Sequence, residues 1–290
     1  MKSLSVLIIH GIGINQANFA DDLVKEIRTE FNNLVTIDLN EHKNYDEFLL
    51  FEPVAWDRLV GKRQKELTEQ IRQNMAKFSK PIQGSVWDKI VGIVLRFANQ
   101  MARADFAAQF IMDIISYGDG PTRQMIFNYI EDHFTQASGR SASTSVIAHS
   151  LGTVIAADLI REKRLRVGNL FTMGSPVQLF SLQYGNDQFK SPVACEEGGR
   201  WVNILDADDP IAYRLEGISE AYSKAVYLKD YEVDCGIFGQ AHVGYWKDKN
   251  VHRVIASKLA MDWLLLNEKI PVEKYNHKLM EYDGMLKAKI

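Results

Sequence analysis

The stretch of sequence that decides the expected fold is Val146-Ile147-Ala148-His149-Ser150-Leu151-Gly152-Thr153-Val154. An apolar run passes directly into a helical pattern through Ser150, with the small residues Ala148 and Gly152 two positions to either side. A nucleophile elbow needs this arrangement, because the strand turns into a helix so tightly that the serine takes strained dihedral angles. The start of the helix also directs backbone N–H dipoles at developing negative charge. A turn in which Ser150 only caps a helix would leave the same motif, so both interpretations stay open at this point.

Outside this stretch, the chain alternates between strand and helix patterns. Continuous apolar runs predict strands that are buried on both faces. One such run lies at 4–9, and further strands are predicted at 48–56, 144–148, 170–173, 201–205 and 226–233, with a shorter candidate at 35–37. Apolar stripes with helical spacing lie at 19–31, 67–78, 86–116, 151–163 and 251–266. The alternation indicates the α/β class, with a mainly parallel sheet flanked by helices.

Composition narrows the class of protein. The 290 residues are 46% hydrophobic and 24% charged, which is typical of a packed globular chain. With 34 Lys and Arg against 37 Asp and Glu, the net charge of −3 gives no reason to expect a nucleic-acid partner. No apolar run approaches the ~20 residues of a transmembrane segment, and the first run is too short for a signal peptide. We therefore expect a cytoplasmic protein. Cys195 and Cys235 are too few for a disulfide framework or a metal site, and no cofactor is expected.

A second motif, His10-Gly11-Ile12-Gly13, follows the first predicted strand. Its two glycines would let the backbone approach a reacting carbonyl group and turn an N–H toward it. A phosphate-binding loop is the competing interpretation. The third glycine of a Rossmann motif is absent, however, and no Gly-Lys-Ser or Gly-Lys-Thr sequence occurs. A phosphate-binding loop is therefore disfavoured.

With these two motifs the sequence resembles the α/β-hydrolase family, specifically its lipase-like and esterase-like members. Ala148 replaces the first glycine of the family's G-x-S-x-G motif, which is a mild departure. The resemblance implies the α/β-hydrolase fold, with Ser150 as the nucleophile. It also implies an oxyanion hole made by the backbone N–H groups of Ile12 and Leu151. The supporting positions in the two motifs are His10, Gly11, Gly13 and Gly152.

Two later segments complete the site that the resemblance implies. The family's acid follows the strand predicted at 201–205 by about four residues, which selects Asp209 and leaves Asp206 as the alternative. The base belongs to the loop before the last helix, where His242 stands and His252 is the nearby rival. In chain order these residues give Ser, Asp and His, which is the order that this fold imposes. The resemblance gives His149 a packing role only.

Residues 58–118 interrupt the alternation with helical patterns alone. This segment contains ten Lys or Arg and five Asp or Glu, whereas the rest of the chain is acidic. We expect a core domain at 1–57 and 119–290, and a helical insertion at 58–118 that forms a cap or lid over the site. An ordinary core helix is the alternative interpretation of its apolar residues. The basic charge would allow contact with an anionic membrane surface, although a solvated basic face is the simpler explanation.

The resemblance implies a serine hydrolase that cleaves carboxylic esters with an apolar acyl group through an acyl-enzyme intermediate. The substrate would be a small-molecule or lipid-like ester. A thioesterase or a phospholipase would use the same three residues, and the sequence does not separate them. A non-catalytic interaction protein with a hydrolase fold is the alternative from another class, and the complete Ser150, Asp209 and His242 pattern argues against it. The sequence does not indicate an oligomeric state.

Overall fold

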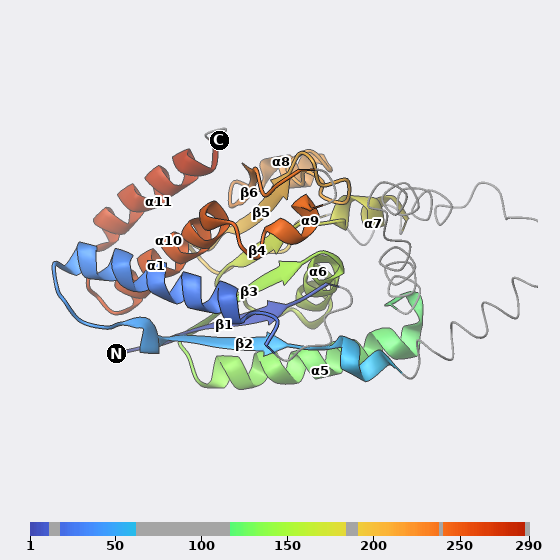
Figure 1. The fold of residues 1–290 in the computed structure, drawn as a ribbon, viewed down its shortest axis with the longest axis horizontal. Coiled ribbons are helices and arrows are strands. Elements are labelled where there is room, and N and C mark those ends of the chain that lie inside the picture. The colour runs from blue at the N-terminus through green and yellow to red at the C-terminus, as the bar shows by residue number, and fades with distance from the viewer. Residues whose placement is uncertain (12–17, 62–116, 184–190, 238–239, 288–290) are drawn as a thin grey trace, which may run out of the picture.

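A parallel sheet of six strands lies at the centre of the structure (Figure 1). The computed structural model describes residues 1–11, 18–61, 117–183, 191–237 and 240–287. Within them, the strands follow the order β2-β1-β3-β4-β5-β6, and every pairing between neighbours is parallel. The strands are β1 (Leu4–Ile9), β2 (Leu49–Val54), β3 (Ser143–His149), β4 (Leu170–Met173), β5 (Trp201–Asp206) and β6 (Leu228–Val233). The predicted α/β class with a mainly parallel sheet is confirmed.

Helices cover both faces of this sheet, because successive residues of a buried strand point to opposite sides. In β1, Val6 and Ile8 belong to the same buried cluster as residues of α1 (Asp21–Leu39), α10 (Lys249–Leu266) and α11 (Val272–Lys287). Leu7 and Ile9 belong instead to the cluster that contains residues of α5 (Gly120–Gly139) and α6 (Leu151–Lys163). Figure 1 shows these two groups of helices on either side of the strands. The shorter helices are η1 (Asp46–Phe48), α7 (Val177–Gln183), α8 (Glu220–Lys224) and α9 (Ala241–Gly244).

The strand order reverses at β1, and this reversal indicates where a ligand would bind. From β1 the chain moves outward to β2 and then returns to the other side of β1 as β3. In open parallel sheets, the carboxyl ends of the strands that flank such a reversal leave a crevice in which ligands bind. His10 and Gly11 follow β1 and Ser150 follows β3, so both motifs lie at the carboxyl ends of the strands that flank this reversal.

The prediction of a strand at 35–37 is wrong, because these residues belong to α1. The β-branched side chains of this segment favour a strand, but the helical stripe simply continues at a spacing of four. Burial of that stripe stabilises the helix as far as Leu39, and Asn40 then ends it in a left-handed conformation with φ of 50°. The buried residues of the stripe are Leu23, Ile27, Phe31 and Val35.

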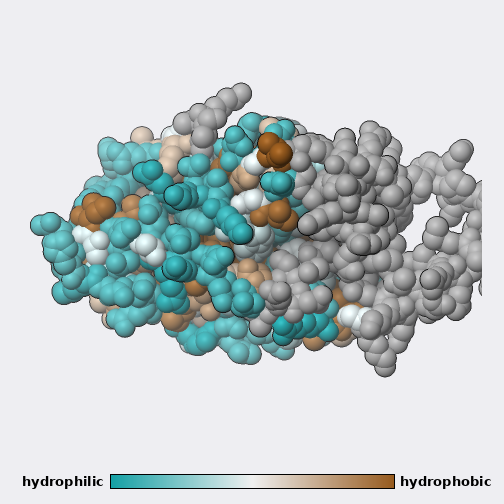
Figure 2. All heavy atoms as spheres, viewed as in Figure 1, coloured by the Kyte–Doolittle hydropathy of each residue, from teal (hydrophilic) through white to brown (hydrophobic). Residues whose placement is uncertain are grey.

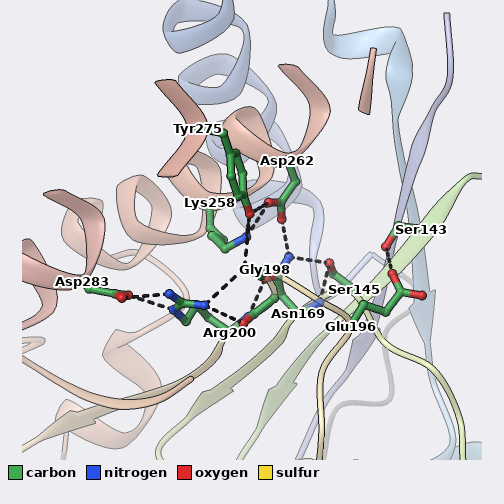
Figure 3. A network of polar contacts seen from close by, with 11 residues as sticks. Ser143, Ser145, Asn169, Glu196, Gly198, Arg200, Lys258, Asp262, Tyr275 and Asp283 are labelled. Atoms are coloured by element: carbon green, nitrogen blue, oxygen red, sulfur yellow. Dashed lines mark hydrogen bonds and ion pairs between the residues drawn. The ribbon is translucent and has the colours of Figure 1, made fainter. Parts of the chain in front are cut away.

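A network of polar side chains lies at the opposite, amino-terminal edge of the sheet (Figure 3). Lys258 of α10 is fully buried, and its ammonium group is paired with the carboxylate of Asp262 one turn later. Asp262 also accepts hydrogen bonds from Asn169 Nδ2 at 2.8 Å and from the Tyr275 hydroxyl at 2.9 Å. Burial lowers the pKa of Lys258, and the charge of Asp262 opposes that shift. These contacts join α10 and α11 to the loop that precedes β4.

A second ion pair fastens α11 to the same edge of the sheet. The guanidinium of Arg200, directly before β5, donates to both carboxylate oxygens of Asp283, at 2.9 and 2.8 Å (Figure 3). Arg200 also donates to the carbonyl oxygens of Gly198 and Gly199. The paired fork geometry fixes the orientation of the helix more firmly than a single contact would.

Most of the predicted insertion at 58–118 falls outside the described residues, which include only 58–61 and 117–118 of it. The surface in Figure 2 is drawn in grey there, and the remainder of that face is mostly hydrophilic with scattered apolar side chains. Among the described residues, no helix combines the length and the apolar composition that a membrane crossing requires.

Asp262→Ala is expected to destabilise the protein strongly, because it leaves the buried ammonium group of Lys258 without its carboxylate. The free energy of unfolding should fall by about 3–5 kcal/mol, which urea denaturation measures. The control is Glu220→Ala, which breaks the exposed pair between Glu220 and Lys224 and should cost less than about 1 kcal/mol. Similar losses in the two variants would show that burial does not set the strength of the Lys258 pair.

Candidate active site

The turn between β3 and α6 is tight and strained at Ser150. This residue has φ of 54° and ψ of −130°, a conformation that a non-glycine residue adopts at a cost of about 1–3 kcal/mol. Its backbone N–H donates to the carbonyl oxygen of Met173 in β4 at 3.0 Å. On the other side, a Cβ at Gly152 would lie 2.5 Å from the carbonyl oxygen of His10. The turn is therefore held between β1 and β4, and only glycine fits at position 152.

The backbone after β1 lies directly against Ser150. A Cβ at Gly11 would lie 2.5 Å from the Ser150 Cβ and 3.2 Å from its Oγ, so this position also requires glycine. Ile12 and Gly13, the other residues of the predicted oxyanion loop, lie outside the described residues. Leu151 is buried and begins α6. The backbone N–H groups in the first turn of a helix have no partner within the helix, so they remain available to an anion.

His10 is fully buried and fixes the backbone around Gly11. Its Nδ1 donates to the carbonyl oxygen of Gly11 at 2.6 Å, since a carbonyl oxygen can only accept. The ring is stacked on Trp56 with centroids 5.6 Å apart, and the indole N–H of Trp56 donates to the His10 carbonyl at 2.9 Å. Nε2 lies 3.3 Å from Oδ1 of the buried Asp57. The end of β1 is thus tied to the segment that follows β2.

Ser150, His242 and Asp209 form a continuous line of hydrogen bonds. The Nε2 atom of His242 lies 2.9 Å from Ser150 Oγ, and its Nδ1 atom lies 2.9 Å from Asp209 Oδ2. All three residues are at most 2% exposed. Ser150 follows β3, Asp209 follows β5, and His242 lies in α9, so the carboxyl edge of the sheet brings together residues that are distant in the sequence.

The surroundings of Asp209 keep its carboxyl group ionised. Burial alone raises the pKa of Asp209, but the nearby His242 and three hydrogen bonds outweigh it and lower the pKa below its ordinary value. The donors are His242, the backbone N–H of Ile211 at 3.0 Å and the Tyr245 hydroxyl at 2.9 Å. An ionised carboxylate only accepts, so Nδ1 of His242 carries a proton. In the neutral ring, the lone pair of Nε2 then faces the Ser150 hydroxyl.

Asp206, the alternative acid in the sequence, has a different set of contacts. Its two carboxylate oxygens accept hydrogen bonds from the backbone N–H groups of Asp208 at 2.8 Å and Cys235 at 2.5 Å. It therefore orders the loops after β5 and β6. The rival base, His252, lies in α10 with its Nε2 3.0 Å from the carbonyl oxygen of Trp246.

Tyr245 is a residue of the site that sequence reasoning missed. Its hydroxyl group donates to Asp209 Oδ2 at 2.9 Å and accepts from the backbone N–H of Asp206 at 2.9 Å. Gly174 follows β4 with φ of 58°, and a Cβ there would lie within 3.1 Å of Tyr245, Asp209 and His242. Tyr245 stands three residues after His242, and residues three apart share a helix face. This spacing could have indicated that Tyr245 lies near the site.

The structure shows no arrangement for a metal ion in the part of the chain that it describes, where no group of three or more His, Cys, Asp or Glu side chains converges. Cys195 and Cys235 are both free thiols. Burial raises the pKa of Cys195 to about 12, so this thiol is protonated at neutral pH and is a weak ligand.

No model of a known protein family matches this chain, and a search of curated proteins likewise gives no match. Its function is therefore inferred from the geometry of the site.

Gly11→Ala should destabilise the fold, because the new methyl group would overlap Ser150 Cβ. We expect the free energy of unfolding in urea to fall by about 1–3 kcal/mol, the usual cost of overpacking. Gly217→Ala is the matched control, since a Cβ at Gly217 meets no atom of the described residues within 4 Å. Equal stability of the two variants would contradict the close approach of Gly11 to Ser150.

Asp209 should make the stability of the protein depend on pH in acid. Because its pKa is lowered in the folded state, the ionised group contributes stability that is complete above the ordinary value of 3.8 and is lost as the pH falls through the folded pKa. The stability difference between wild type and Asp209→Asn should therefore shrink as the pH falls from about 4 to about 2. Urea denaturation at a series of pH values measures it. A difference that grows toward acid would mean that the pKa of Asp209 is raised instead.

Proposed function

We propose that this protein is a serine hydrolase that cleaves carboxylic esters with an apolar acyl group. The observation that carries the proposal is the buried line of hydrogen bonds from Ser150 through His242 to Asp209, with 2.9 Å at each step. A neutral imidazole placed between a hydroxyl group and an ionised carboxylate is the arrangement that activates a serine nucleophile.

In this mechanism His242 Nε2 accepts the proton of Ser150 as its oxygen attacks the ester carbonyl. Asp209 holds the imidazole in the required tautomer and stabilises its positive charge. His242 then gives the proton to the departing alcohol, which leaves the acyl group on Ser150. In the second half of the reaction, His242 accepts a proton from water as the water oxygen attacks the acyl carbonyl. His242 then returns this proton to Ser150 Oγ as the bond to the acyl group breaks and the acid leaves.

The negative charge that develops on the substrate oxygen would be stabilised by the backbone N–H groups of Leu151 and Ile12. Two observations support this assignment. Leu151 begins α6 directly after the nucleophile, and Gly11, next to Ile12, packs against the Ser150 side chain. Removing one such donor from related sites costs about 10²–10³ in kcat.

We infer further that the fold is an α/β-hydrolase fold of six strands, with the core at 1–57 and 119–290. The strained serine turn after β3, the acid after β5 and the histidine after β6 support this inference. Residues 58–118 would form a helical cap that selects the acyl group, since they join the chain at the carboxyl edge between β2 and α5. Contact between this basic segment and an anionic surface belongs to the same proposal.

The first test treats purified protein with a fluorophosphonate probe and with p-nitrophenyl esters of increasing acyl length. We expect labelling at Ser150 and ester hydrolysis. Ser150→Ala should abolish labelling, and Asp209→Asn should lower kcat by about 10⁴-fold because it disturbs the imidazole tautomer. The matched control is Asp206→Asn, which should lower the free energy of unfolding but leave kcat close to the wild-type value. Absence of both labelling and hydrolysis in the wild-type protein would refute the proposal and favour a non-catalytic interaction protein.

A second comparison separates the substrate classes that share these residues. Thioesters and phospholipids are offered beside the simple esters, and kcat/KM is measured for each. A clear preference for thioester or phospholipid would correct the substrate class while keeping the roles of Ser150, His242 and Asp209.

A further inference from the structure

His149 connects the residue before the nucleophile to the backbone of the base. It is the last residue of β3, and its Nε2 lies 2.7 Å from the main-chain carbonyl oxygen of His242. A carbonyl oxygen can only accept a hydrogen bond, so Nε2 carries the proton and donates it. The contact spans 93 positions in the sequence and joins the carboxyl end of β3 directly to α9.

The helix that carries His242 needs such a contact. α9 has only four residues, and its N-cap residue Gln240 makes no capping hydrogen bond through its side chain. So short a helix has little stability of its own, and its position is set by tertiary contacts. The His149 ring lies between the rings of this segment, with centroids 4.8 Å from His242, 6.1 Å from Tyr245 and 5.3 Å from Trp246.

The charge of His149 also suits a position beside the base. The ring is 4% exposed, and burial together with the neighbouring His242 lowers its pKa to about 3. His149 therefore stays neutral at the pH values at which a histidine base operates. The ring centroids of His149 and His242 are 4.8 Å apart, so a positive charge on His149 would destabilise the imidazolium that His242 becomes when it accepts a proton.

A packing role alone does not explain a histidine here. Its Nδ1 atom is buried and meets no hydrogen-bond partner among the residues that the structure describes, which is unfavourable in a protein interior. A phenylalanine would fill a similar space without burying an unsatisfied nitrogen. Within the described part of the chain, the ring makes one hydrogen bond, and its acceptor is the His242 carbonyl oxygen.

We propose that His149 is a positioning residue, which holds the His242 imidazole at hydrogen-bonding distance from Ser150 through the bond from Nε2 to the His242 carbonyl. This inference rests on the proposed function, because it assigns His242 the role of base. It differs from the packing role that the sequence resemblance implies for His149.

The test compares two substitutions of similar size. His149→Phe keeps a planar ring but has no donor, whereas the side-chain amide of His149→Gln places a nitrogen donor near the position of Nε2. With a p-nitrophenyl ester, we expect His149→Phe to lower kcat roughly 10- to 100-fold with KM changed less than about 3-fold, since small displacements of a reacting group cost this much. His149→Gln should recover most of the loss.

The control is His252→Phe, which removes a comparable bond from a buried histidine to a backbone carbonyl, at 3.0 Å to Trp246, away from Ser150. It should keep kcat within about 3-fold of the wild-type value. Unchanged kcat in His149→Phe, or equal loss in the Phe and Gln variants, would show that His149 acts only by packing.

Nitrogen NMR of ¹⁵N-histidine-labelled protein tests the contact without any assay of activity. We expect the His149 signals, which are identified by their loss in His149→Gln, to report a neutral ring protonated at Nε2 from pH 5 to pH 8. A ring protonated at Nδ1, or one that titrates near pH 6, would overturn the inference. If the wild-type protein neither reacts with fluorophosphonate nor hydrolyses esters, the proposed function fails, and the NMR result still decides whether His149 holds the His242 backbone.

Discussion

The site depends on one steric constraint, the close packing of the turn at Ser150 between β1 and β4. The turn is strained, with φ of 54°, and it persists because its neighbours leave no alternative path for the backbone. Gly152 touches the carbonyl groups at the end of β1, while Gly11 touches the serine itself. This contact presents the Ser150 hydroxyl at the carboxyl edge of the sheet and brings the loop after β1 beside it.

The two edges of the sheet carry different kinds of polar contact. At the carboxyl edge, Ser150, His242 and Asp209 form a hydrogen-bonded line, and His242 lies in a helix of four residues. At the amino edge, the buried Lys258 and its partners fasten the long helices α10 and α11 to the strands. Ionic contacts at one edge can stabilise a fold that keeps a strained turn at the other edge.

Local patterns in the sequence were sufficient to predict the class of the fold. Each of the six strands overlaps a predicted segment. The apolar run is clearest in β1, which is buried along its whole length, whereas β6 at the edge of the sheet also contains charged residues. The prediction of secondary structure failed where tertiary packing overrides the local preference of the residues. The segment at 35–37 has strand-favouring residues, yet burial of Val35 beside Phe31 keeps it in α1. The pairing of Arg200 with Asp283, which positions α11, has no local signal, because its partners are 83 residues apart.

By itself the sequence determined the Ser150 turn, since small residues at fixed spacing are a local steric requirement, and it ranked Asp209 above Asp206. Only the tertiary structure decided how these carboxylates are used, because backbone N–H groups from two loops surround Asp206 whereas the His242 ring meets Asp209. It also decided the surroundings of His242, where Tyr245 and His149 approach from separate elements. Contacts of this kind join residues that are far apart in the sequence, and local sequence patterns do not specify such contacts.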